Sequence, residues 1–225
     1  LAFLGLEPEP MDEGCLHLNV FTPGADDAAR PVMVWIHGGA FFMGSGSSPM
    51  YDGVSLVERG DIVLVTINYR LGALGFLELG WLDEDLAGSA NCGLLDQVAA
   101  LEWVRDNIAT FGGDPGNVTI FGESAGSMSV TGLLAMDTAK GLFHKVAAQS
   151  GGNNTYRTTD MAANIKAQQA IAAHTLKNLN LTGDQIDKLK TVPYNDLIVA
   201  GVAALPLAAR EVGRPSLNWE VIADD

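Results

Sequence analysis

Two short runs of residues that favour buried strands constrain the fold of this chain more than any other feature. Residues 32–36 and 62–67 are apolar or β-branched at every position instead of alternating with polar residues. Strands covered on both faces, as in a parallel sheet between layers of helices, have this pattern. Shorter runs at 118–121 and 146–149 add two more predicted strands. The sequence therefore predicts an α/β fold with a mostly parallel central sheet.

Other periodicities predict what surrounds this sheet. Residues 16–21 alternate along the chain, which is typical of an edge or antiparallel strand. The glycine-rich stretch 112–116 is expected to end a helix, and a second helix is predicted from Ala125 to about Met136. The first of these two helices is predicted from one apolar stripe with a spacing of three or four residues, formed by Leu94, Val98, Leu101, Val104 and Ile108.

The strand pattern fades after Gly152. Polar and alanine-rich stretches there predict helices at about 161–180, 183–190 and 195–204. We therefore expect a single domain over residues 1–225, with a sheet core in 1–152 and a helical cap or insertion in 153–225.

Composition excludes several kinds of partner. Asp and Glu outnumber Lys and Arg 27 to 13, which gives a net charge of −14 and a pI near 4.5. Such a chain repels nucleic-acid phosphates and anionic membranes. The chain has no apolar run near the ~20 residues that a membrane span needs. Two cysteines, Cys15 and Cys92, are too few for a disulfide framework, although a single Cys15–Cys92 bond stays open.

The sequence around Ser124 carries the strongest chemical indication. Gly122-Glu123-Ser124-Ala125-Gly126 follows a predicted strand and precedes a predicted helix. G-x-S-x-G in that context is a nucleophile elbow, a sharp turn that lifts the serine hydroxyl above the sheet. The alternative is a glycine-rich turn that exposes a serine without chemical use.

A second glycine-rich segment directly follows the strand at 32–36. His37-Gly38-Gly39-Ala40 offers backbone N–H groups that small side chains leave accessible. Donors of this kind hold the oxyanion that forms when a nucleophile attacks a carbonyl. The alternative is a glycine turn shaped only by packing.

Taken together, these motifs resemble the type-B carboxylesterase family, which also contains the cholinesterases. The likeness is dense from about residue 12 to 152 and weak beyond. It implies a partial α/β-hydrolase fold and a serine esterase with an acyl-enzyme mechanism, acting on a small-molecule ester without a cofactor or metal. The matching segments are 13–20, 35–41, 65–72, 93–97, 107–108, 111–115, 118–126 and 149–151.

The resemblance implies roles for individual residues. Ser124 matches the nucleophile, and the backbone N–H groups of Gly39, Ala40 and Ala125 match the three donors of the oxyanion hole. Glu123 matches a buried acid beside the nucleophile.

More distant positions match supporting groups. Ser150 matches a serine that supports the triad acid. Arg70 and Asp96 match a structural ion pair, and Glu13 matches half of another whose arginine lies upstream.

The resemblance also places the triad acid and histidine downstream of these 225 residues. Of the four histidines, His37 is expected to fix the oxyanion loop, and His17 also precedes Ser124. His144 and His174 lack the position after the last strand that a general base needs. We therefore expect the central part of a longer enzyme, incomplete at both ends and inactive alone.

Several alternatives stay open. The chain could be a non-catalytic, cholinesterase-like adhesion or binding module, or a natural fragment with a regulatory role. Short-chain esters are the expected substrates, and the resemblance implies that a wide oxyanion loop with Ala40 tolerates bulky alcohols. Three glycosylation sequons, at Asn117, Asn153 and Asn180, are weak evidence for secretion. Localisation and oligomeric state are left undecided.

Overall fold

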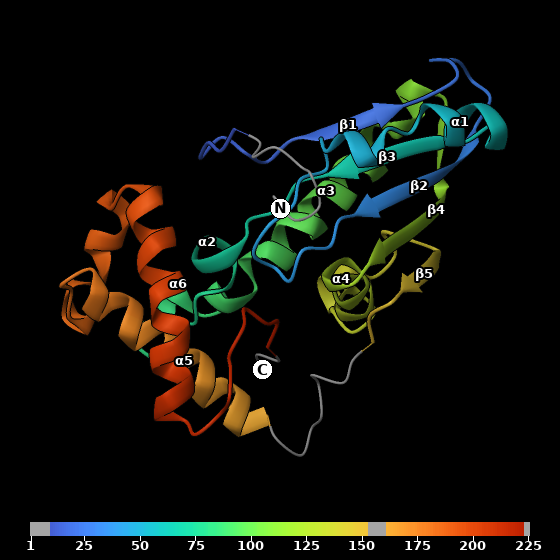
Figure 1. The fold of residues 1–225 in the computed structure, drawn as a ribbon. Helices are drawn as coiled ribbons and strands as arrows, with labels where there is room; N and C mark the ends of the chain where they lie inside the picture. The colour runs from blue at the N-terminus through green and yellow to red at the C-terminus, as the bar shows by residue number, and fades with distance from the viewer. Residues whose placement is uncertain (1–9, 153–160, 223–225) are drawn as a thin grey trace.

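The computed structural model describes residues 10–152 and 161–222. Five strands form one sheet in the order β1-β3-β2-β4-β5 (Figure 1). β2, β3, β4 and β5 run parallel, whereas β1 pairs antiparallel with β3 at the edge. Both predictions for the sheet are therefore confirmed. The strands are β1 (Leu18–Phe21), β2 (Arg30–Ile36), β3 (Val63–Ile67), β4 (Gly113–Glu123) and β5 (Lys145–Gln149).

One face of the sheet carries the main core. α3 (Cys92–Asn107) and α4 (Ala125–Leu133) pack there against alternate side chains of β2, β3 and β4. The predicted apolar stripe of α3 is buried from Leu94 to Val104, and Ile108 continues it into the 3-10 turn η5 (Ile108–Phe111). β4 begins at Gly113, inside the stretch predicted as a helix terminator, because Gly113 pairs with Arg30 across a register irregularity.

The opposite face is covered by α1 (Val54–Gly60), whose Val57 packs with Ile62 and Leu64. α1 and α2 (Gly72–Phe76) were not predicted. Helices of two turns or fewer are too short to show an apolar period. Shorter 3-10 turns complete this part of the chain: η2 (Pro49–Tyr51), η3 (Glu84–Leu86), η4 (Ser89–Asn91) and η6 (Asp137–Ala139).

Helices dominate after residue 160, as predicted. α5 (Met161–Asn178) and α6 (Tyr194–Glu211) pack together at one side of the sheet, and α6 also contacts α2 (Figure 1). η8 (Gly183–Thr191) is a 3-10 segment. The predicted end at residue 204 is wrong, because the helix continues past Pro206, which is exposed, while Ala204 and Ala208 on the buried side hold it in place.

Among the described helices, none combines the length and apolar character that crossing a bilayer requires. The division into a sheet core and a helical cap stays a prediction.

Candidate active site

Ser124 occupies the sharp turn between β4 and α4. Its backbone has φ 55° and ψ −118°, a combination that residues with a side chain rarely adopt. Its N–H donates to the Gln149 carbonyl at 2.9 Å, and its carbonyl accepts from the Met128 N–H at 3.0 Å. Ser124 is half-buried at this turn. β5 and α4 therefore hold the serine in a strained geometry that matches the predicted elbow.

The two glycines of the motif are explained by crowding. A Cβ on Gly126 would overlap the Ile36 carbonyl oxygen, and a Cβ on Gly122 would lie 2.6 Å from that oxygen. No side chain fits at either position, because β2 passes directly beside the turn. The sequence-based reason for these glycines is thus visible in the structure.

The segment from Gly38 to Phe41 lies against the same turn. A Cβ added to Gly38 would stand 3.3 Å from the Ser124 Cβ. Gly39, Ala40 and Phe41 all have positive φ, of 114°, 54° and 56°. This loop therefore runs past the serine in an unusual left-handed path.

The predicted oxyanion donors are not used in the backbone hydrogen bonding of the described residues. Neither the Gly39 N–H nor the Ala40 N–H donates to a backbone carbonyl there. Ala125 begins α4, and the N–H groups of a first helical turn have no acceptor within the helix. Unpaired donors beside a serine are what an oxyanion site requires.

His37 begins this loop and is held by three contacts, while its predicted role of fixing the loop stays a prediction. The side chain is 1% exposed, and its Nδ1 donates to the Gly38 carbonyl at 2.8 Å. Its ring stacks on Tyr69 with the centroids 4.5 Å apart, and the Tyr69 hydroxyl donates to the His37 carbonyl at 2.7 Å. Burial raises the pKa of Tyr69, so the hydroxyl keeps the proton it donates.

Glu123 departs from the expectation of a buried acid. Its side chain is exposed, although Oε2 lies 3.2 Å from where a Gly38 Cβ would stand. Glu123 ends β4 next to Gln149 of the edge strand β5, whose side chains are largely exposed. Consequently no layer of side chains covers the carboxylate in the described chain.

Ser150 lies close to the elbow along the chain, but its side chain is exposed. The neighbouring Gly151 carbonyl accepts a 2.5 Å hydrogen bond from Ser127 of α4. A Cβ on Gly151 would overlap the Ser124 carbonyl oxygen. The end of β5 thus wraps the elbow, while the supporting role of Ser150 stays a prediction.

The predicted ion pair is present. Arg70 Nε and Nη2 each lie 2.8 Å from an Asp96 oxygen, and the Arg70 N–H adds a third contact at 2.9 Å. This bidentate pairing raises the pKa of Arg70 and ties the end of β3 to α3.

Neither the disulfide considered for Cys15 and Cys92 nor the ion pair expected for Glu13 is found among the described residues. Cys15 and Cys92 are both free thiols whose pKa values are raised by burial, so the disulfide left open is not formed. Glu13 is exposed, and no ion pair to it is present in the described part of the chain.

Three of the four histidines lie in other parts of the fold. His144 accepts from the Val118 N–H at 3.1 Å, six residues and ~20 Å of strand before Ser124. His174 contacts Glu211 at 2.8 Å between α5 and α6, and His17 is exposed near the edge strand β1. Within the described ranges, no group of three or more His, Cys, Asp or Glu side chains is arranged to hold a metal.

Comparison with known proteins decides the family. The sequence model of the carboxylesterase family matches residues 3–224. The chain belongs to this family. Among curated relatives of this carboxylesterase chain, para-nitrobenzyl esterase of Bacillus subtilis (strain 168) is 53% identical over 188 residues. Phenmedipham hydrolase of Pseudarthrobacter oxydans is 41% identical over 198 residues.

These alignments cover 84% and 87% of the carboxylesterase chain but only 37% of each relative. The chain therefore spans less than two fifths of their length. A solved thermophilic para-nitrobenzyl esterase matches with a TM-score of 0.81 and 45% identity, over 95% of this chain and 42% of that one. An esterase from Clostridium hathewayi is described as hydrolysing aliphatic aromatic polyesters. It matches with a TM-score of 0.84 and 43% identity, over 97% of this chain and 43% of that one. These neighbours confirm the predicted α/β-hydrolase fold.

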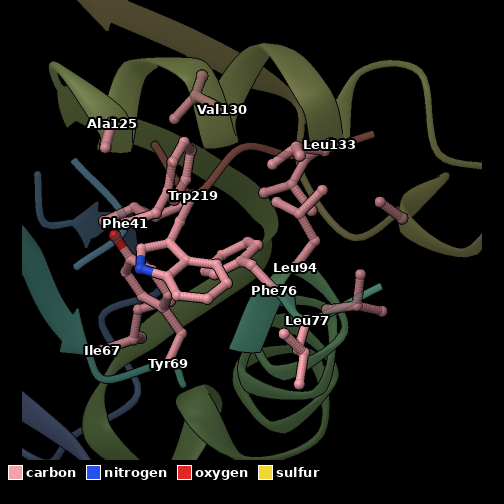
Figure 2. Packing of buried hydrophobic residues seen from close by; sticks show 14 of the residues in the cluster. Phe41, Ile67, Tyr69, Phe76, Leu77, Leu94, Ala125, Val130, Leu133 and Trp219 are labelled. Carbon is pink, nitrogen blue, oxygen red and sulfur yellow. The ribbon is translucent and has the colours of Figure 1, made fainter. Parts of the chain in front are cut away.

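Sequence reasoning gave no role to Tyr69, which lies beside the candidate site of this carboxylesterase-family chain. Its motif, Asn68-Tyr69-Arg70, was noticed only as part of the resemblance. One indication was available, because Tyr69 follows β3 at the same sheet edge where β2 leads into the oxyanion loop. Figure 2 shows Tyr69 in the buried cluster that also contains Phe41 and Ala125.

Proposed function

We propose that this chain carries the nucleophile and oxyanion hole of a serine carboxylic-ester hydrolase. The observation that supports this most is the close approach of Gly38 to the strained Ser124 turn, because the next two residues, Gly39 and Ala40, have N–H groups that donate to no backbone carbonyl among the described residues. A hydroxyl and empty donors on adjacent backbone form the minimal arrangement for attack on an acyl carbon.

The reaction would proceed in two stages. Ser124 Oγ attacks the ester carbonyl carbon as a general base takes its proton, and the carbonyl oxygen becomes an oxyanion held by Gly39, Ala40 and Ala125. The C–O bond to the alcohol then breaks, the alcohol leaves with the proton, and an acyl-Ser124 ester remains. Water attacks this ester in the same way and releases the acid. Because each step is a proton transfer or nucleophilic substitution, the scheme needs no metal or organic cofactor.

The general base and its acid partner would come from residues outside these 225. An alcohol is a poor nucleophile at neutral pH without a base. None of His17, His144 and His174 is available as that base, because each lies in another part of the fold, away from Ser124. The chain alone would then keep only the oxyanion contribution, with kcat lower by about a millionfold.

We propose short-chain carboxylic esters as the substrates, with p-nitrophenyl acetate and butyrate as probes. The relatives named as esterases support this class. Ala40 is exposed at the loop tip, which suits a bulky alcohol group. No nucleic-acid partner is expected, because the net charge of −14 repels phosphates.

The test is covalent labelling of the natural protein with a fluorophosphonate, followed by mass spectrometry of the labelled peptide. We expect the label on Ser124 and its complete loss in Ser124→Ala. Ser216→Ala, at an exposed serine outside the site, is the matched control and should label like the wild type. Undiminished labelling of Ser124→Ala would reject the assignment. An unlabelled wild type would favour the non-catalytic binding module.

A further inference from the structure

A segment close to the end of the chain reaches the neighbourhood of the oxyanion loop. Residues 217–222 bury four apolar side chains: Leu217, Trp219, Val221 and Ile222. Two buried amides hold the segment on either side of Trp219. Gln168 donates to the Asn218 carbonyl at 3.2 Å, and Asn91 bonds both the N–H and the carbonyl of Ile222, at 3.2 and 2.8 Å. The position of the indole is therefore fixed from both directions.

The Trp219 indole lies between α2 and α6. It is 2% exposed and belongs to the cluster of Phe41 and Phe76 (Figure 2). A Cβ on Gly201 of α6 would lie 3.1 Å from Cζ2, and a Cβ on Gly72 of α2 would lie 3.7 Å from Nε1. Among the described residues, Nε1 has no hydrogen-bond partner. The Trp219 indole is therefore held in place by packing and not by a hydrogen bond.

Gly72 connects this packing to the oxyanion loop. Its N–H donates to the carbonyl of Phe41 at 2.7 Å, and Phe41 directly follows Ala40 in the chain. Gly72 itself has φ +57°, so its N–H direction depends on a left-handed backbone that its surroundings must maintain. The indole at Gly72 thus lies one hydrogen bond away from the loop.

We propose that Trp219 is a positioning residue for the oxyanion hole, an inference that rests on the proposed function. Ala40 and Phe41 are consecutive non-glycine residues with positive φ, and such backbone persists only where its surroundings over-determine it. The indole fills the space beside Gly72 and thereby holds the Gly72–Phe41 hydrogen bond. Through that bond it keeps the Gly39 and Ala40 N–H groups directed at the Ser124 turn. Without the indole, the loop relaxes and the donors move.

The experiment compares kcat and KM for p-nitrophenyl butyrate in the natural protein, with active sites counted by stoichiometric organophosphate titration. Because misplaced donors weaken binding of the oxyanion and not of the ester, Trp219→Ala should lower kcat per titrated site about tenfold or more, with KM within about twofold. Trp219→Phe, which keeps an aromatic ring, should lower kcat per titrated site about threefold. Gly201→Ala, whose Cβ would lie 2.9 Å from the Ala73 Cβ of α2 and 3.1 Å from the indole, crowds the packing between α6, α2 and Trp219 and should also lower kcat.

Leu176→Ala is the matched control. Leu176 is 4% exposed on α5 and lies outside the cluster that holds Trp219. It should lower the melting temperature while keeping kcat per titrated site. If Trp219→Ala does not fold, kcat per titrated site of Trp219→Phe decides whether the positioning role holds.

Unchanged kcat in the Trp219 variants, or an equal loss in Leu176→Ala, overturns the positioning role while leaving Ser124 as the nucleophile. A wild type without turnover or labelling overturns the proposed function, and the positioning role falls with it.

Discussion

The Tyr69 hydroxyl donates a 2.7 Å hydrogen bond to the His37 carbonyl, and the two rings stack at 4.5 Å with an interplanar angle of 21°. The end of β3 is thereby joined to the first residue of the oxyanion loop through two contacts of different kinds. Both groups are almost fully buried. This link makes the loop part of the core and not a surface turn.

Tyr69→Phe should therefore lower the free energy of unfolding by about 1–3 kcal/mol, since a buried carbonyl loses its donor. Urea unfolding measures this change. Tyr194→Phe is the control, because its hydroxyl bonds the Met11 carbonyl in an exposed setting. Equal losses in the two variants would mean that the His37 link contributes nothing specific.

Ser124→Gly should be more stable than Ser124→Ala by about 1–2 kcal/mol. Glycine relieves the positive-φ strain of about 1–3 kcal/mol, which exceeds its entropic cost of about 0.5–1 kcal/mol. Thermal unfolding of the two inactive variants gives the comparison. At Ser216, where φ is not positive, glycine should be the less stable of the pair. The same order at both positions would contradict strain at the elbow.

Gly126→Ala should destabilise the protein by about 3 kcal/mol, because the added methyl group overlaps the Ile36 carbonyl oxygen and β2 must shift. Circular dichroism during urea unfolding follows the loss. Gly152→Ala meets nothing within 4 Å and should be neutral. A tolerated alanine at Gly126 would show that the close approach of β2 and α4 is not required.

Asp96→Asn should lower the free energy of unfolding by about 2 kcal/mol. This is less than the 3–5 kcal/mol typical of a fully buried pair, because the Arg70 side chain is 38% exposed and partly hydrated. Chemical denaturation again provides the readout. Asp106→Asn breaks an exposed pair with Arg105 and should show no measurable change. A loss of similar size there would point to charge in general and not to burial.

Glu220 should make stability fall as pH rises. Burial raises the pKa of this carboxyl, and Arg214 only partly opposes the shift. The folded state therefore holds the proton more tightly than the unfolded state, so the stabilisation is complete below the ordinary pKa of a glutamate and is lost as pH passes the raised value. Glu220→Gln should remove this slope. Denaturation midpoints between pH 4 and 7 test it, and an unchanged slope would refute it.

Different features of the chain were predictable for different physical reasons. Strands at 32–36 and 62–67 could be predicted because neither has a polar face: β3 is buried on both faces, and the second face of β2 carries the half-buried Met33 and Trp35. α2 could not, since five residues show no period. The helix predicted to end at residue 204 continues through Pro206, because buried alanines on the other side of α6 hold it in place.

The contacts at the site were less accessible than the elements. Ser124 and the glycine-rich segment after β2 could be proposed as a site from local motifs, while the roles of single residues in that segment came from the family resemblance. The approach of Gly38 to Ser124 joins residues 86 positions apart, and only the sheet order brings them together. Burial of Glu123 was inferred from the family likeness, whereas its side chain is exposed among the described residues, because cover at this edge depends on neighbours that no local pattern encodes.

The chemistry proposed for Gly39 and Ala40 belongs to their main-chain N–H groups, on a left-handed path that follows Gly38 past the Ser124 turn. Every amino acid except proline carries the same N–H, so replacing a side chain never removes a donor, and at Gly39 it adds a Cβ that would overlap the Met43 carbonyl oxygen. Replacing single peptide linkages with esters, by semisynthesis, deletes one donor at a time while leaving each side chain as it was. The contribution of each N–H group in this loop is therefore measured by changing the backbone and not a side chain.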